Sequence, residues 1–172
     1  MPPLSVSERD EFLQQPGILC RIATIRPDGA PHVTPIWFIC EDNAIYITPR
    51  AESSWLAHLR VDPRVALTID DQLAPYRKVT VEGAVELLYD TGDDDAWRER
   101  YRRIACRYVP AEGAEYYVQE TIDQPRALLR VSLDQSKVRT WRMPVQGEPY
   151  TGIWHQRYYV PGSKMEARAG KE

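Results

Sequence analysis

The residues best suited to chemistry stand at positions 48–54, which read TPRAESS. This turn leads directly into an apolar, helix-periodic segment, so Ser53 or Ser54 is placed to cap a helix N-terminus. Free backbone N–H groups at that terminus, the two hydroxyls and the Arg50 guanidinium could converge on a phosphate. A capped helix beside a surface arginine explains the same residues equally well, and both interpretations stay open at this point.

The histidines show no metal-ligand pattern. His32, His58 and His155 are far apart and lack a spacing such as HxxxH, so no metal site is predicted. His58 falls on the helix expected after position 53 and is interpreted as a partly exposed surface residue.

The cysteines and the glycine pattern also exclude several enzyme classes. Cys20, Cys40 and Cys106 have no CxxC spacing, and their odd number suits a reducing cytosol better than a disulfide framework. None has a neighbour that marks it as a nucleophile, and there is no GxSxG elbow. No glycine-rich phosphate loop is present, so any phosphate must be held in another way.

The hydrophobic pattern predicts a mainly β chain with a few helices. A capping box at Ser5-Val6-Ser7-Glu8 begins a short helix that Pro16-Gly17 ends. Further helices are expected from Ser53 to Leu59 and, as an amphipathic helix, from Thr91 to Tyr108. Strands are expected at 18–26, 31–40, 44–48, 64–69, 78–88, 127–132 and 137–141. The first three strands form an antiparallel meander, and the whole order predicts a β-barrel with peripheral helices.

Size and charge limit the choice of partners. The 172 residues suit a single domain at 1–162 followed by a loose polar tail at 163–172. A net charge of −3 does not suit a nucleic-acid binder. The N-terminus is too polar for a signal peptide, and no apolar run approaches the roughly 20 residues of a membrane span. We therefore expect a cytoplasmic protein with small-molecule partners and no membrane partner.

Four segments together resemble a known family. The runs IATIRPDGAPHVTPIWF, AIYITP, SSWLAHLRVDPRVALTI and YRKVTVEGAVELL are similar to the pyridoxamine 5′-phosphate oxidase-like flavin split-barrel superfamily. The likeness covers Ile18 to Leu88 and is strongest to the branch of flavin- and deazaflavin-dependent reductases. It implies a split β-barrel of antiparallel strands, assembled as a homodimer with cofactor at the interface.

The resemblance also implies roles for individual residues. The FMN ring would be lined by Thr34, Pro35, Trp37 and Thr48, and its phosphate held by Arg50, Ser53, Ser54 and Lys78. Pro35 interrupts an apolar strand, where a proline cannot donate to the ladder. The resemblance places that strand beside the flavin, so the missing N–H leaves no unpaired donor.

The C-terminal part resembles the closing segment of the true oxidases. VRTW at 138–141 and WHQRY at 154–158 carry this likeness. It implies that Trp141 and Arg157 contact flavin from the partner subunit and that His155 faces the substrate.

Two departures from the oxidases alter the expected function. The Ser-Arg-Lys of the oxidases is replaced by Ser53-Ser54-Trp55, so Arg50 and Lys78 would have to supply the phosphate charge. Ile153 stands where the oxidases have a substrate-binding arginine. The expected function is therefore an FMN-dependent oxidoreductase that acts on a small molecule other than pyridoxamine phosphate.

Two alternatives remain open. The deazaflavin F420 could replace FMN, since its more acidic tail would suit Arg50, Arg77 and Lys78. A non-catalytic haem or flavin binder is the other alternative, with His155 or His58 as the haem ligand to test.

Overall fold

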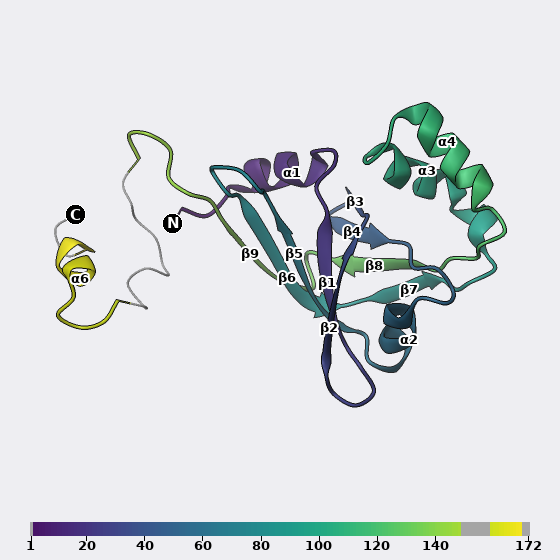
Figure 1. Cartoon of the computed structure of the whole chain (residues 1–172), viewed down its shortest axis with the longest axis horizontal. Coiled ribbons are helices and arrows are strands. Elements are labelled where there is room, and N and C mark those ends of the chain that lie inside the picture. Colours follow the sequence, from purple (N-terminus) through teal and green to yellow (C-terminus); the bar gives the residue numbers. More distant parts are fainter. Residues whose placement is uncertain (1, 149–158, 170–172) are drawn as a thin grey trace.

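The computed structural model describes residues 2–148 and 159–169, which form two antiparallel sheets with helices around them (Figure 1). The five-stranded sheet has the order β2-β1-β5-β6-β9 and the four-stranded sheet the order β3-β4-β8-β7. In chain order the strands are β1 Cys20–Ile25, β2 Pro31–Ile36, β3 Ile39–Glu41, β4 Ala44–Ile47, β5 Arg64–Asp70, β6 Lys78–Ala84, β7 Glu86–Tyr89, β8 Leu128–Ser132 and β9 Lys137–Trp141. The helices are α1 Val6–Gln14, α2 Ser54–Val61, the 3-10 turn η1 Asp94–Ala96, α3 Arg98–Cys106, α4 Ala111–Glu120 and α6 Lys164–Ala169.

The core lies between the two sheets, as the alternating sequence pattern predicts. Cys20, Ile22 and Thr24 on β1 are buried, whereas Arg21 and Ala23 between them are only half-buried. Side chains of the other sheet, such as Ile45 and Leu129, join the same core cluster. This arrangement confirms the mainly β, split-barrel fold class. Among the described residues, no helix is long and apolar enough to cross a membrane.

The first two helices begin where the sequence places them. The Ser5 hydroxyl accepts from the Glu8 N–H at 3.2 Å, and the Glu8 carboxylate accepts from the Ser5 N–H at 2.7 Å. This reciprocal capping box begins α1, and Ser53 stands at the N-cap of α2. Both helix predictions are confirmed.

Two predicted strands are each divided between the sheets, which corrects the expected meander. The segment 31–40 forms β2 in one sheet and β3 in the other, with Trp37 and Phe38 between them. The segment 78–88 divides at Val85 in the same manner. At each of these two points, which we call crossings, the chain passes from one sheet to the other. One continuous apolar run in the sequence therefore contains two strands.

The first crossing is fixed by one side chain of the helical layer. The Phe38 N–H donates to the Tyr108 hydroxyl at 3.1 Å, and that hydroxyl donates to the Ile18 carbonyl at 2.9 Å. The Tyr108 ring also stacks on Trp37 with centroids 4.8 Å apart and planes 3° apart. Tyr108 therefore satisfies a backbone donor that has left the sheet and holds Trp37 in place.

The helical region after β7 differs from the prediction of one helix over 91–108. It contains η1 and α3, which meet at Trp97, and a further helix, α4, that the sequence reading missed. Figure 1 shows α3 and α4 side by side at one end of the molecule. Trp97, Tyr101 and Val118 belong to a second buried cluster with Tyr46 and Leu128 of the four-stranded sheet. The α3–α4 hairpin thus covers the outer face of that sheet. The polar tail, expected to be loose, contains the short helix α6.

Replacing Tyr108 by phenylalanine should lower the free energy of unfolding by about 1–3 kcal/mol, because the Phe38 N–H loses its partner. Chemical denaturation monitored by circular dichroism measures this change. Tyr116→Phe is the matched control, since Tyr116 is 68% exposed on α4. Equal stability of the two variants would show that Tyr108 does not hold the crossing.

Candidate functional site

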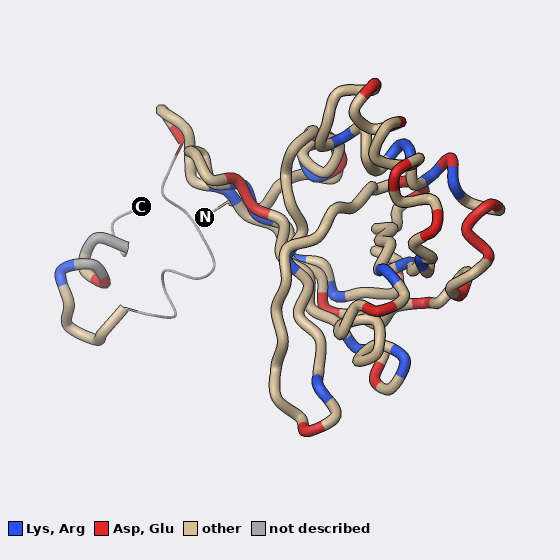
Figure 2. The backbone as a smooth tube through the Cα atoms, turned by 45° about the vertical axis from the view of Figure 1, so that its right-hand side comes forward, with Lys and Arg blue, Asp and Glu red and all other residues tan. Residues whose placement is uncertain are grey.

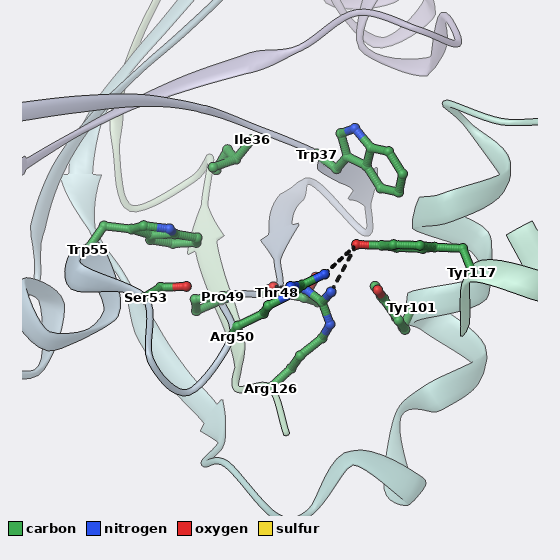
Figure 3. Close-up of a pocket in the computed structure, with 10 residues that line it drawn as sticks. All are labelled: Ile36, Trp37, Thr48, Pro49, Arg50, Ser53, Trp55, Tyr101, Tyr117 and Arg126. Carbon is green, nitrogen blue, oxygen red and sulfur yellow. Dashed lines mark hydrogen bonds between the residues drawn. The ribbon is translucent and has the colours of Figure 1, made fainter. Parts of the chain in front are cut away.

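A pocket of about 260 Å³ opens between the first crossing, the β4–α2 segment and the α3–α4 hairpin (Figure 3). Its lining residues come from segments far apart in the sequence. They are Ile36, Trp37, Thr48, Pro49, Arg50, Ser53, Trp55, Tyr101, Tyr117 and Arg126. Four residues predicted to bind cofactor, Trp37, Thr48, Arg50 and Ser53, are therefore brought together by the fold.

Two arginines converge on one phenol oxygen in this pocket, as Figure 3 shows. The Arg50 Nη2 donates to the Tyr117 hydroxyl at 3.2 Å, and the Arg126 Nη2 donates to the same oxygen at 3.1 Å. The two Nη2 atoms therefore lie no more than 6.3 Å apart. Within the described part of the chain, neither guanidinium forms an ion pair with a carboxylate.

Arg126 is a site residue that the sequence reading missed. It is only 7% exposed, which is unusual for an arginine without a carboxylate partner. Its Nη1 donates to the Thr48 carbonyl at 2.9 Å, and its guanidinium lies 4.4 Å from the centroid of the Tyr101 ring. Its position, two residues before β8, carries no sequence motif, so only the fold reveals its place in the pocket.

The main chain of Arg126, unlike its guanidinium, is hydrogen-bonded to a carboxylate. Figure 2 shows acidic residues concentrated in the turn before α3, at positions 90–95. From this turn Asp94 accepts the backbone N–H of Arg126 at 2.9 Å. The carboxylate therefore fixes the main chain at position 126 and leaves the guanidinium directed into the pocket.

The two pocket tyrosines have opposite pKa shifts. Burial raises the pKa of Tyr101 to about 12. Burial acts in the same direction on Tyr117, but the neighbouring Tyr101 and the two arginines outweigh it and lower the Tyr117 pKa. Tyr117 is therefore the more acidic phenol of the pair.

The start of α2 forms the opposite side of the pocket. Ser53 occupies the N-cap position, yet its side chain makes no capping hydrogen bond. The first N–H groups of a helix have no acceptor within the helix, so this end offers backbone donors and a hydroxyl. Ser54, predicted to help hold phosphate, is exposed and does not line the pocket.

The strand register shows how the predicted ring-lining residues of β2 are oriented. Thr34 is opposite the buried Ile22, and Pro35 is opposite the half-buried Arg21. Thr34 therefore points to the barrel side and Pro35 to the outer face, and neither lines the pocket. In the described part of the chain β2 is an edge strand, where a missing N–H need not interrupt a ladder.

Lys78 and Trp141 lie together but away from the pocket. They are paired residues on β6 and β9, and the Lys78 ammonium is 4.8 Å from the centroid of the Trp141 ring. Three strand spacings, about 14 Å along the sheet, separate β6 from β2. Neither Lys78 nor Trp141 lines the pocket that contains Arg50. The predicted residues His155 and Arg157, with Ile153, lie outside the described residues.

His58, Cys20 and Cys40, which the sequence offered as possible functional groups, are buried. His58 is 8% exposed, which corrects the expected surface position, and its Nδ1 lies 3.0 Å from the Thr24 hydroxyl. Burial raises the pKa of the Cys20 thiol to about 12 and that of Cys40 to about 11. Both thiols are therefore protonated at neutral pH. Over residues 2–148 and 159–169, no three His, Cys, Asp or Glu side chains gather to hold a metal ion.

Comparison with known families gives the pocket its context. The profile of the family described as pyridoxamine 5′-phosphate oxidase matches residues 6–141, most of the chain. The chain belongs to this family. The match contains both crossings, the pocket residues and the Lys78–Trp141 pair, whereas the oxidase-like segment at 154–158 lies beyond it.

Solved structures of this superfamily show the same fold. A conserved hypothetical protein from Mycobacterium tuberculosis is 26% identical with a TM-score of 0.66, over 87% of this chain and 92% of the other. An F420 reductase is 26% identical with a TM-score of 0.52, over 76% and 92% of the two chains. The haem storage protein HutZ from Vibrio cholerae is 19% identical with a TM-score of 0.58, over 78% and 94%, a likeness of fold alone. No protein of curated function matches the sequence significantly.

Proposed function

We propose that this pyridoxamine 5′-phosphate oxidase family protein is an oxidoreductase that uses a phosphate-bearing flavin, FMN, bound in the pocket between α2 and the α3–α4 hairpin. The observation that carries the proposal is the pair of guanidiniums that face an aromatic pocket and have no carboxylate partner among the described residues. Family membership supports the same conclusion. The absorption spectrum and mass of the small molecule released from the purified protein test it directly.

The pocket has the donors and the surfaces that such a cofactor needs. Arg50, the Ser53 hydroxyl and the α2 N–H groups would hold the acidic group, and Trp37 would pack on the ring. Arg126 Nε, a buried polar atom without a partner in the described chain, fits a polar ligand here. When bound, the cofactor supplies hydride transfer, and this chain binds it, orients it and excludes water.

F420 is the second candidate cofactor. The 26% identity to an F420 reductase over 76% of this chain favours it. Two arginines that form no ion pair within the described residues suit its acidic tail. Haem is less well supported, because His58 faces the interior and is bonded to Thr24. The mass of the released ligand distinguishes all three cofactors.

Arg50→Ala should weaken FMN binding by about 1.5–3 kcal/mol, the usual worth of a hydrogen bond to a charged group. The affinity for riboflavin, which lacks the phosphate, should barely change. Arg64→Ala is the matched control, since Arg64 is exposed and ion-paired to Asp62. Fluorescence titration measures all these affinities. If riboflavin binding weakens as much as FMN binding, Arg50 does not hold the phosphate.

A homodimer would complete the site. At about 260 Å³ the pocket is smaller than the usual small-molecule site of roughly 300–1,000 Å³. The resemblance assigns Lys78, Trp141 and Arg157 to the same cofactor, and a second copy can supply them. The outer face of the five-stranded sheet offers a close-packing surface, because Val33, Ala23 and Ala66 are in register across three strands.

We therefore expect a dimer by light scattering at micromolar concentration, with cofactor lost when the dimer is broken. Ala66→Arg places a bulky charge on the exposed middle of that face and should give a folded monomer that binds FMN weakly. Ala57→Arg is the control, since Ala57 is exposed on α2. A monomeric wild type that retains cofactor would contradict the dimer proposal.

Pyridoxamine 5′-phosphate should not be an efficient substrate. Ile153 replaces the arginine of the oxidases, and losing one such contact costs about 1.5–3 kcal/mol, roughly ten- to a hundredfold in binding. Hydrogen peroxide release during incubation with pyridoxamine 5′-phosphate is the assay. Rapid release would show that the missing arginine is compensated elsewhere.

A further inference from the structure

The α3–α4 hairpin brings a phenol to the pocket at the point where two cations meet. Tyr117 reaches across from α4, Arg50 comes from the segment before α2, and Arg126 lies two residues before β8. Two like charges this close repel each other, and a neutral phenol oxygen offsets this repulsion only in part. An oxyanion at the same point would be attracted by both guanidiniums.

Arg126 is held in this position by groups that do not neutralise it. Its partners are the Thr48 carbonyl, the Tyr117 hydroxyl and the face of the Tyr101 ring, and its Nε has no partner in the described chain. A buried cation without a carboxylate is costly unless a ligand compensates it. The Tyr101 residue, which is 4% exposed, also lines the pocket beside this cation.

From this geometry we infer that Arg126, Arg50 and Tyr117 form an oxyanion clamp that binds one phosphate or carboxylate group. Both guanidiniums donate to the bound oxyanion, and the Tyr117 hydroxyl donates a third hydrogen bond. The inference rests on the proposed function, since it concerns the same pocket. It goes further in making Arg126, together with Tyr117 of α4, the main binding group for the oxyanion. The oxyanion comes from the cofactor or from an acidic substrate, and both sources share this chemistry.

Inorganic phosphate is the probe, titrated into the full-length chain after co-purified small molecules have been removed. Calorimetry should show binding that Arg126→Gln weakens about tenfold or more, as expected for a lost charged hydrogen bond. Arg130→Gln is the matched control, because Arg130 lies on the adjacent strand β8 and is ion-paired to Glu86. Its phosphate affinity should equal that of the wild type.

The tyrosinate absorbance of Tyr117 provides a second readout that does not depend on folding differences. The groups that face its hydroxyl are Arg50, Arg126 and Tyr101, with Trp37 beside the ring. Bound phosphate offsets the guanidinium charges, so the pKa of Tyr117 should rise and its tyrosinate fraction at a fixed alkaline pH should fall. Tyr117→Phe, which removes one oxygen from a half-buried side chain, should abolish this change and weaken phosphate binding.

The affinities for FMN and riboflavin distinguish the two sources of the oxyanion. If the cofactor supplies it, Arg126→Gln weakens FMN binding and leaves riboflavin binding unchanged. If a substrate supplies it, the variant loses phosphate binding while both flavins bind as before. Either result supports the clamp.

Absence of phosphate binding in the wild type, or equal losses in Arg126→Gln and Arg130→Gln, would overturn the clamp. An unchanged tyrosinate response in Tyr117→Phe would do the same. These outcomes are independent of the proposed function, which fails only if neither flavin nor F420 binds.

Discussion

The passage of the chain from one sheet to the other at Trp37 and Phe38 is the constraint on which the site depends. A backbone that leaves a sheet must find new partners for its N–H and C=O groups. The Tyr108 hydroxyl supplies one and, through the Ile18 carbonyl, ties the crossing to the start of β1. Because Tyr108 follows α3, the same contact attaches the helical hairpin to the barrel beside Trp37, which lines the pocket.

The electrostatics of the pocket follow from how that hairpin is anchored. Apolar and aromatic residues of α3 and α4 pack on the four-stranded sheet. This packing places Tyr101 and Tyr117 along one side of the pocket. The Arg126 guanidinium contacts the face of the Tyr101 ring and donates hydrogen bonds to the Tyr117 hydroxyl and the Thr48 carbonyl. Such partners orient a guanidinium without neutralising it, which leaves a positive centre in an aromatic surrounding. FMN and F420, the two cofactors that we propose for it, each join a flat ring to an acidic tail.

The segments of the chain that resemble the family do not all meet in one chain. The 48–53 segment lines the pocket, while Lys78 and Trp141 pair with each other on β6 and β9. Neither Lys78 nor Trp141 lines that pocket. Their common role in a cofactor site, which the resemblance implies, therefore requires the second copy that we propose. The small residues on the outer face of the sheet permit such a contact.

The sequence by itself determined those features that depend on neighbours a few residues away. The capping box of α1, the start of α2 and the alternation of the strands are local, and they appear in the structure as predicted. Arg50 and Ser53 were singled out because their turn precedes a helix N-terminus, and Trp37 and Thr48 through the family resemblance. All four line the pocket.

Only the tertiary structure decided where the strands change sheet, that His58 is buried, and that Arg126 and Tyr117 belong to the pocket. Each of these features arises from contacts between residues distant in sequence. Arg50 meets Tyr117 across 67 positions, and Tyr108 meets Phe38 across 70. No local periodicity or spacing records such contacts, since they form only when the two sheets and the helical hairpin pack together.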